Sequence, residues 1–330
     1  MINKLIKSTV ALSLVASVAF AAPAVRFNVV PGDIEDKFEE LVLGGTLNED
    51  TGFGVSDPHE KINDAYSKRY GNPEDPDYDK AWTTNLDNLG FFSIANDKAL
   101  YDILKKAPQA AGFQPFNYHI YKYVAEDKTY VGHLDPALML DVTGVKDKAV
   151  REAYIKMYEP LDKWTTDTFG GKVVISEYDT LPAKPMMTFE FEVDREGDIV
   201  EWAEGFQEEF EAAFEEKKYI IAGFKNFKST YEEDLEMDFE EYDQFFVYGL
   251  CHFTYSYGIF NKGRPDAGAL APCAMYFYIK PGSNKMVVGM PRLETWLHVM
   301  KITDKDKIKS AMDLDVEIIG IMKDLGGVEK

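Results

Sequence analysis

The side chains that could carry out chemistry in this chain are scattered, and no catalytic signature connects them. The five histidines are separate, with no HExxH or paired-histidine spacing, and the chain contains no CxxC, GxGxxG, GxxxxGK or GxSxG motif. A Ser-His-Asp triad needs no fixed order along a chain, so that arrangement stays open. The missing signatures weigh against a common hydrolase or nucleotide-dependent enzyme.

One histidine and one methionine suggest a metal site. His133 and Met290 each follow a Val-Gly dipeptide, at corresponding places in two similar stretches of sequence. If these stretches pack about a pseudo-two-fold axis, the two side chains could face each other, and His with Met is a ligand set for haem iron or copper. The alternative is that both are strand-end residues on different surfaces and bind nothing.

Cys251 and Cys273 are the only cysteines in the sequence. In an oxidising compartment they could form a disulfide, which would contribute about 3 kcal/mol. The alternative is two small buried side chains. Internal alignment favours the second interpretation, because it places Cys251 on Leu86 and Cys273 on Phe116. A predicted hairpin also puts Cys273 opposite Ile259 rather than Cys251.

Two acidic segments are candidate binding sites. Asp75, Asp77 and Asp79 form a DxDxD pattern that suggests calcium, but Lys80 and Leu86 stand where an EF-hand needs Gly and Glu, so a plain polar loop is the alternative. The run Glu232–Asp243 holds eight acidic residues in twelve. We expect it to be a solvated excursion, with a basic protein partner as the other interpretation.

Aromatic residues are the enriched class, at 14% of the chain. Several tyrosines alternate along predicted hairpin strands, so that one strand face would be core and the other a seam between units or a pocket wall. The candidates for a pocket or seam are Asn96, Asn261, Tyr121, Tyr278, Tyr255 and Tyr257.

The elements that must position these residues come in two copies. A Gly-Asp-Ile at 32–34 recurs 165 residues later at 197–199, and the same offset carries Tyr66 onto Tyr231 and Asn96 onto Asn261. Farther along, an offset of 157 relates the hairpin at 116–134 to that at 272–291. The change of offset predicts an eight-residue deletion between positions 261 and 272. An internal duplication is therefore expected.

Each copy shows the pattern of an α+β unit, with a mostly antiparallel sheet covered by helices on one face, and the two units should pack as an intramolecular pseudo-dimer. Units are expected at 22–164 and 186–330, with a linker at 165–185. Asp33 and Asp198 are expected to be the N-caps of two helices, and apolar residues at helical spacing give the second of these one core-facing side. The predicted helices are 33–47, 198–217, 147–164 and 304–325, and a strand is predicted at 244–260.

The second copy resembles a known bacterial family. The stretch from Tyr255 to Leu293 contains Ile-Phe-Asn at 259–261, Ala-Pro-Cys at 271–273 and a hairpin of aromatic and β-branched strands. It is similar to the family called domain of unknown function 302 (DUF302), which the first copy resembles more loosely through 94–100 and 115–134. The resemblance implies a small sheet-and-helix domain that pairs with a second copy. It implies no activity and no catalytic residue.

The first 21 residues predict export. A basic start, an apolar run and an Ala-x-Ala site ending at Ala21 are typical of a cleaved signal peptide, and the apolar run is too short for a membrane span. We expect a periplasmic protein with no membrane span after cleavage. Acidic residues outnumber basic ones by 57 to 36, which disfavours nucleic acid and anionic membranes as partners.

These observations predict an exported binding or accessory protein whose ligand lies near the seam between the units. Its partner would be a small molecule or a protein, and the chain would be a monomer with a pseudo-two-fold axis or a weak homo-oligomer. No cofactor is the leading expectation, with haem, copper or calcium as alternatives. The rival functions are a redox or metal-binding protein that uses His133, Met290 or the cysteines, and an enzyme of a class without a sequence signature.

Overall fold

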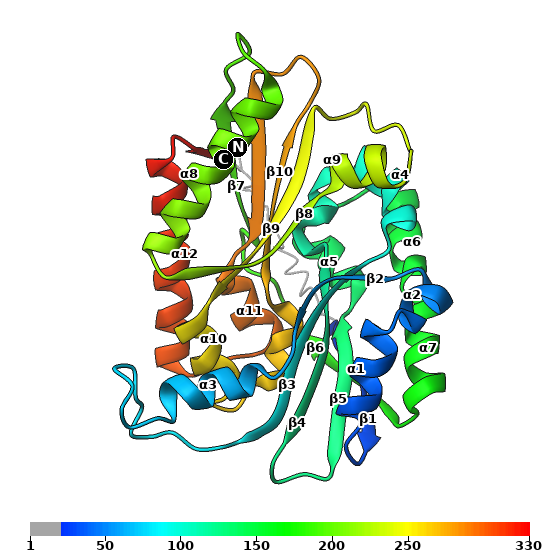
Figure 1. The fold of residues 1–330 in the computed structure, drawn as a ribbon, viewed down its shortest axis with the longest axis vertical. Coiled ribbons are helices and arrows are strands. Elements are labelled where there is room, and N and C mark those ends of the chain that lie inside the picture. Colours follow the sequence, from blue (N-terminus) through cyan, green and yellow to red (C-terminus); the bar gives the residue numbers. More distant parts are fainter. Residues whose placement is uncertain (1–20) are drawn as a thin grey trace, which may run out of the picture.

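The computed structural model describes residues 21–330, and the predicted signal sequence lies, apart from Ala21, outside the described residues. The chain forms two six-stranded antiparallel sheets, one in each half of the sequence, with helices packed on them (Figure 1). Within residues 21–330, no helix combines the length and apolar character that crossing a membrane requires. The α+β class and the two similar units are confirmed.

The first unit contains the first sheet and its helices. Its elements are β1 (Ala22–Pro31), α1 (Glu35–Leu43), α2 (Thr46–Thr51), β2 (Gly54–His59), α3 (Ile62–Tyr70), β3 (Leu86–Ala95), α4 (Asp97–Lys106), the 3-10 helix η1 (Pro108–Phe113), β4 (Phe116–Tyr123), β5 (Lys128–Leu134), α5 (Pro136–Val142), α6 (Lys148–Met157), α7 (Glu159–Phe169) and β6 (Lys172–Tyr178).

The second unit repeats this plan with fewer helices. Its elements are β7 (Met186–Glu192), α8 (Ile199–Glu216), β8 (Tyr219–Asn226), α9 (Phe227–Ser229), the π-helical turn η2 (Thr230–Asp234), β9 (Gln244–His252), α10 (Phe253–Phe260), the 3-10 helix η3 (Pro265–Leu270), β10 (Cys273–Ile279), β11 (Lys285–Pro291), α11 (Leu293–Val299), α12 (Lys305–Asp324) and β12 (Val328–Glu329).

The two sheets have the same strand order. The first runs β2-β3-β4-β5-β1-β6 and the second runs β8-β9-β10-β11-β7-β12. The irregularities match as well, because a bulge interrupts β2 between Val55 and Asp57 and β8 between Ile221 and Gly223. Pro115 and Pro272, which the offset of 157 places in corresponding positions, precede the central strands β4 and β10 and follow cis peptide bonds. The register thus gives a residue-by-residue correspondence between the units.

Helices cover one face of each sheet, as the amphipathic periodicity predicted. In the second unit α8 starts at the side-chain cap of Asp198 and buries Phe206, Phe210 and Phe214 along one side. Phe210 packs edge-on against Phe277 of β10, with ring centroids 5.1 Å apart. This stripe of aromatic rings fixes α8 on the sheet and leaves its glutamates in solvent.

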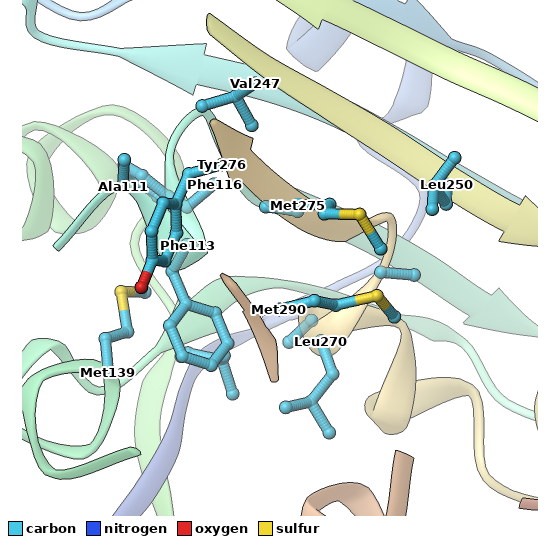
Figure 2. Packing of buried hydrophobic residues seen from close by; sticks show 14 of the residues in the cluster. Ala111, Phe113, Phe116, Met139, Val247, Leu250, Leu270, Met275, Tyr276 and Met290 are labelled. Carbon is cyan, nitrogen blue, oxygen red and sulfur yellow. The ribbon is translucent and has the colours of Figure 1, made fainter. Parts of the chain in front are cut away.

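The other faces of the two sheets meet at the seam, where each unit inserts a short helix against the other's central strand. η1 packs on β10, and η3 packs on β4. Figure 2 shows Ala111 and Phe113 of η1 beside Tyr276 of β10. In the reciprocal contact Asn117 of β4 donates to the carbonyl of Gly268 at 2.6 Å. The predicted pseudo-dimer is therefore built by exchange of equivalent elements.

The structure corrects four of the predicted boundaries. The expected strand 244–260 is β9 followed by α10, and the predicted linker 165–185 contains the end of α7 and all of β6. Predicted helices 33–47 and 147–164 are each broken into two, α1 with α2 and α6 with α7. Aromatic alternation misled the prediction for α10, since Phe and Tyr suit a half-buried strand as well as a buried helix.

The alignment also needs one correction. Asn96 caps the start of α4, and the residue that caps α10 is His252, whereas Asn261 lies at the other end of α10. Asn96 therefore corresponds to His252. The length difference between the units does not fall between 261 and 272. It falls before β9, where the first unit has α3 and a long loop at 71–85.

Candidate functional site

The seam is closed on its two sides by pseudo-equivalent contacts around α10 and α4. Tyr257 of α10 and Tyr101 of α4 occupy corresponding positions, and each hydroxyl crosses to the other unit. Tyr257 donates to the Asp79 carboxylate at 2.9 Å, and Tyr101 donates to the carbonyl of Asp238. A lysine lies over each ring, Lys262 just after α10 over Tyr257, and Lys105 of α4 over Tyr101.

On the α10 side, segment 62–83 of the first unit holds the helix. The Tyr257 ring stacks on Tyr70 with centroids 3.9 Å apart and also faces Trp82. Asp79 pairs with Lys262 at 2.7 Å. Hydrogen bonds from Lys262, from the Ala81 amide and from Tyr257 lower the pKa of Asp79 to about 2. This carboxylate is therefore an ionised anchor across the seam at neutral pH.

On the α4 side, the acidic run of the second unit, residues 232–243, holds α4 in the same way. Lys105 pairs with Glu241 at 2.9 Å, and Tyr242 donates to the carbonyl of Leu104 at 2.8 Å. The run at 232–243 is an excursion, as expected, but it packs on the first unit. The other interpretation, that this run binds a basic protein partner, is weakened because Glu241 already pairs with Lys105 of this chain.

Next to the α10 contacts lies a cavity of about 150 Å³ shared by the two units. It is bordered by β2, α3 and β3 of the first unit and by β8, β9, α10 and the residues just before β10 of the second. Its walls are mainly apolar, with four side chains that carry a heteroatom. The lining residues are His59, Ile62, Tyr66, Phe91, Ile220, Ala222, Cys251, Phe253, Ser256, Ala271 and Pro272.

The polar side chains of the cavity are joined by hydrogen bonds that also cross the seam. Nε2 of His59 lies 2.6 Å from the carbonyl oxygen of Ala222. The Tyr66 hydroxyl donates to Ser256 Oγ at 2.7 Å, and Ser256 Oγ donates to the carbonyl of Phe253 at 2.8 Å. These bonds hold the His59, Tyr66 and Ser256 side chains in one orientation. The cavity is thus preorganised on its polar side.

The titratable groups of the cavity are kept neutral. Burial raises the pKa of the Cys251 thiol to about 11, although a hydrogen bond with Ser256 lowers it in part. Burial likewise holds the pKa of Tyr66 well above its usual range. Because the thiolate is the nucleophilic form of cysteine, Cys251 is a poor nucleophile here. The site is better suited to binding than to covalent catalysis.

The pseudo-equivalent place on the other side of the seam is filled differently. The register puts Lys225 where His59 stands and Asp97 where Phe253 stands, and these two form an ion pair at 3.0 Å. Leu100, a fully buried residue of α4, takes the place of Ser256. The two units have thus diverged at the seam. The residues that make the cavity polar and accessible belong to one side only.

The predicted seam residues divide into two groups. Tyr257 and Asn261 lie at the seam, Asn261 because its carbonyl accepts from Asn85 of the first unit at 2.9 Å. Tyr121 and Tyr278 lie on the strand faces that receive η3 and η1, where Tyr121 stacks on Tyr130. The other two lie elsewhere. Asn96 contacts Thr51 within its own unit, and Tyr255 packs on Trp296 inside the second unit.

The structure does not bring His133 and Met290 together. The imidazole of His133 contacts Asp162 at 3.2 Å and the carbonyl of Leu134, both within the first unit. Met290 borders a cavity of about 20 Å³ inside the second unit, beside Trp296. Each side chain points into the helix-covered core of its own unit, where His133 packs on Phe116 and Tyr158, and Met290 lies near Trp296. A haem or copper site shared by the pair has no geometric basis here.

The other metal candidates are also dispersed. Asp77 pairs with Arg69, Asp79 with Lys262, and Asp75 accepts from a backbone amide, so the DxDxD carboxylates do not converge. Across residues 21–330, no group of three or more His, Cys, Asp or Glu side chains is arranged to hold a metal ion.

Both cysteines are free thiols. Cys273 pairs in register with Leu250, next to Cys251, and not with Ile259 as the predicted hairpin implied. Both cysteines line the cavity of about 20 Å³ inside the second unit, and Cys251 also lines the cavity at the seam.

Comparison with known proteins adds little to this geometry. No protein-family model matches the chain, and no curated protein matches it. Among solved structures, the chain is similar to the uncharacterized conserved protein DUF302 from Bacillus stearothermophilus, with 15% sequence identity and a TM-score of 0.34. That similarity covers 43% of this chain and 98% of the Bacillus chain.

Sequence reasoning missed most of the cavity. His59, Tyr66 and Ser256 were not proposed as site residues, because they lie in three separate elements that only the exchange of elements brings together. One signal was present. Aligning the units in correct register would have shown His59 against Lys225 and Ser256 against Leu100, which are changes of chemical type at positions that the fold makes equivalent.

Proposed function

We propose that this protein is a binding or accessory protein that holds a small, mainly apolar molecule in the cavity between its two units. The observation that carries this proposal is the cavity itself, about 150 Å³ in size, with apolar walls and a hydrogen-bonded polar edge formed by His59, Tyr66 and Ser256. An apolar cavity of this size in another protein accepts benzene. A ligand of about six to ten non-hydrogen atoms is the corresponding size class here.

The location and ancestry of the protein are part of the same proposal. The basic, apolar and Ala-x-Ala segments of residues 1–21 support export to the periplasm. The acidic balance of the chain supports a partner other than nucleic acid. The motif resemblance at 255–293, with the matched strand order of the two units, supports tandem DUF302-like domains. Such a chain would carry its own dimer partner.

The binding proposal is tested with benzene as the probe. Saturation-transfer NMR should detect benzene on the full mature chain, and Ala222→Leu should remove most of that signal by filling the cavity. Ser56→Leu is the matched control, because Ser56 occupies the corresponding position in β2 but does not line the cavity. Equal benzene signals for both variants, or none for the unmodified protein, would overturn the proposal.

A further inference from the structure

We infer that the ligand of the seam cavity carries a hydrogen-bond donor, as a phenol or an indole does, on an otherwise apolar ring. This inference rests on the proposed function and adds the chemical class of the ligand. It follows from an account of which donors and acceptors the lining side chains have already used. The polar lining side chains use their stronger donors inside the protein and retain acceptors.

His59 supplies the first acceptor. A backbone carbonyl can only accept, so the ring nitrogen that lies 2.6 Å from the Ala222 oxygen must carry the hydrogen. In the neutral imidazole the other nitrogen, Nδ1, is then an acceptor. Nδ1 makes no hydrogen bond within residues 21–330. The Ala222 contact thus sets the tautomer and decides what the ring can offer a ligand.

Tyr66 and Ser256 supply the second acceptor. Each hydroxyl has one hydrogen, and both are used, that of Tyr66 on Ser256 and that of Ser256 on the Phe253 carbonyl. Ser256 Oγ accepts from Tyr66 and also contacts the Cys251 thiol, so the acceptor capacity that remains is mainly that of the Tyr66 oxygen. The Tyr66 side chain is fully buried and keeps its proton because burial raises its pKa. The pair therefore cannot switch to donating without breaking an existing bond.

The rest of the lining adds no strong donor. Cys251 has only a weak S–H donor, and the remaining lining side chains are aliphatic, aromatic or proline. The Lys225–Asp97 pair, which would offer a charged donor and acceptor, stands on the other side of the seam. A ligand that only accepts hydrogen bonds would meet acceptors, which is unfavourable. A ligand with one N–H or O–H would complete the network.

Phenol and toluene separate this inference from simple apolar binding, because they have the same number of non-hydrogen atoms. A purely apolar cavity prefers toluene, since burying an unpaired hydroxyl is costly. A cavity with a free acceptor reverses the order. We expect phenol to bind at least ten-fold more tightly than toluene in isothermal titration of the full mature chain. Anisole, whose oxygen has no hydrogen, should behave like toluene.

Two substitutions locate the acceptor. His59→Phe and Tyr66→Phe each remove one acceptor. Removing the acceptor that phenol uses should reduce the affinity for phenol at least five-fold and leave the affinity for toluene unchanged. Tyr101→Phe, which changes the pseudo-equivalent side of the seam, should alter neither the phenol affinity nor the toluene affinity. If a variant fails to fold, the phenol-to-toluene ratio of the unmodified protein still decides.

The outcomes distinguish the two proposals. Phenol binding tighter than toluene and anisole supports the inference. Toluene binding as tightly as phenol, or more tightly, overturns the inference but leaves the binding proposal in place. Failure of benzene, toluene and phenol alike overturns the binding proposal, and the inference falls with it.

Discussion

Glu35, at the start of α1, shows how a single side chain can set the pH response of this fold. One of its carboxylate oxygens is buried and has no hydrogen-bond partner in the part of the chain that the structure describes. Burial raises the pKa of Glu35 to about 7, and Lys61, 3.8 Å away, offsets only part of that rise. The folded protein therefore binds a proton that the unfolded chain releases near pH 4.5.

This raised pKa predicts a stability change with a defined sign. A carboxyl group with a raised folded pKa costs stability as the pH rises from about 4.5 to 7, because ionisation is easier in the unfolded chain. Glu35→Gln should stabilise the protein by about 2 kcal/mol above pH 7 and have little effect at pH 4. Urea denaturation at both pH values measures this. A stabilisation that is the same at both would contradict it.

Asp162 predicts the opposite sign at the other end of the pH range. Burial tends to raise the pKa of its carboxyl, but hydrogen bonding and charge from His133 and Arg26 outweigh it, so the pKa is lowered. The stability it contributes is present above the unfolded pKa, near 4, and is lost as the pH falls further. Asp162→Asn should cost about 1–2 kcal/mol at pH 7 and less at pH 3, which lies below the unfolded pKa, as measured by denaturation. An equal cost at both pH values would contradict the ion-pair explanation.

At the residue scale, local chemistry could be predicted from the sequence and long-range partners could not. Asp198 caps α8 where the sequence indicated, because capping depends on the next three residues only. The same prediction for Asp33 is wrong, since the N-cap of α1 is Ile34 and makes no side-chain cap bond. The bond between Tyr66 and Ser256 spans 190 residues of chain. No local pattern encodes such a contact. It exists because each unit places one element on the other.

At the scale of elements, the hairpins and the amphipathic helix 199–216 were predictable, since their turn residues and apolar periods are strong and unambiguous. The segment 253–260 was not. Its residues are apolar or aromatic at nearly every position, so it has no period that separates a helix from a strand. It became helical in the fold because it must lie across the seam against Tyr70 and Trp82, with its N-terminus capped by His252.

The two helices held across the seam predict a matched pair of mutational effects. Tyr257→Phe removes the hydroxyl that donates to Asp79, and Tyr101→Phe removes the one that donates to the Asp238 carbonyl. Each should destabilise the protein by about 1 kcal/mol, with somewhat more for Tyr257 because its acceptor is charged. Chemical denaturation of both variants and of the double variant tests this. A double variant no less stable than either single one would contradict two independent contacts.

At the scale of the whole molecule, the two units resemble the subunits of a dimer more than independent domains joined by a linker. η1 and η3 each lie on the other unit's central strand, and buried rings such as Tyr276 and His119 face the seam. Either unit alone would expose that surface to water. The fold class and the duplication were predictable from the sequence, but the exchange of η1 and η3 was not, since neither short segment has a regular pattern.

Splitting the chain tests this view of assembly. Fragments 22–182 and 183–330, produced together, should form a one-to-one complex, because each supplies the short helix that covers the other's sheet. Native mass spectrometry and size-exclusion chromatography measure the stoichiometry. Each fragment produced separately should aggregate or self-associate through the uncovered face. Two fragments that stay monomeric and soluble when mixed would show that the seam is not needed to bury apolar surface.

The short connection from β6 to β7, residues 179–185, has a consequence for what the seam can tolerate. A tether of that length holds the units at an effective concentration on the millimolar scale, so their association does not have to overcome the loss of free translation that two separate chains face. A cavity of about 150 Å³ at the seam lacks the packing contacts that a filled interface would make. A dimer of separate chains at cellular dilution could be dissociated by such a defect. In one covalent chain the same defect can persist. The α10 side of the seam can then bind a ligand, while the contacts on the α4 side hold the two units together.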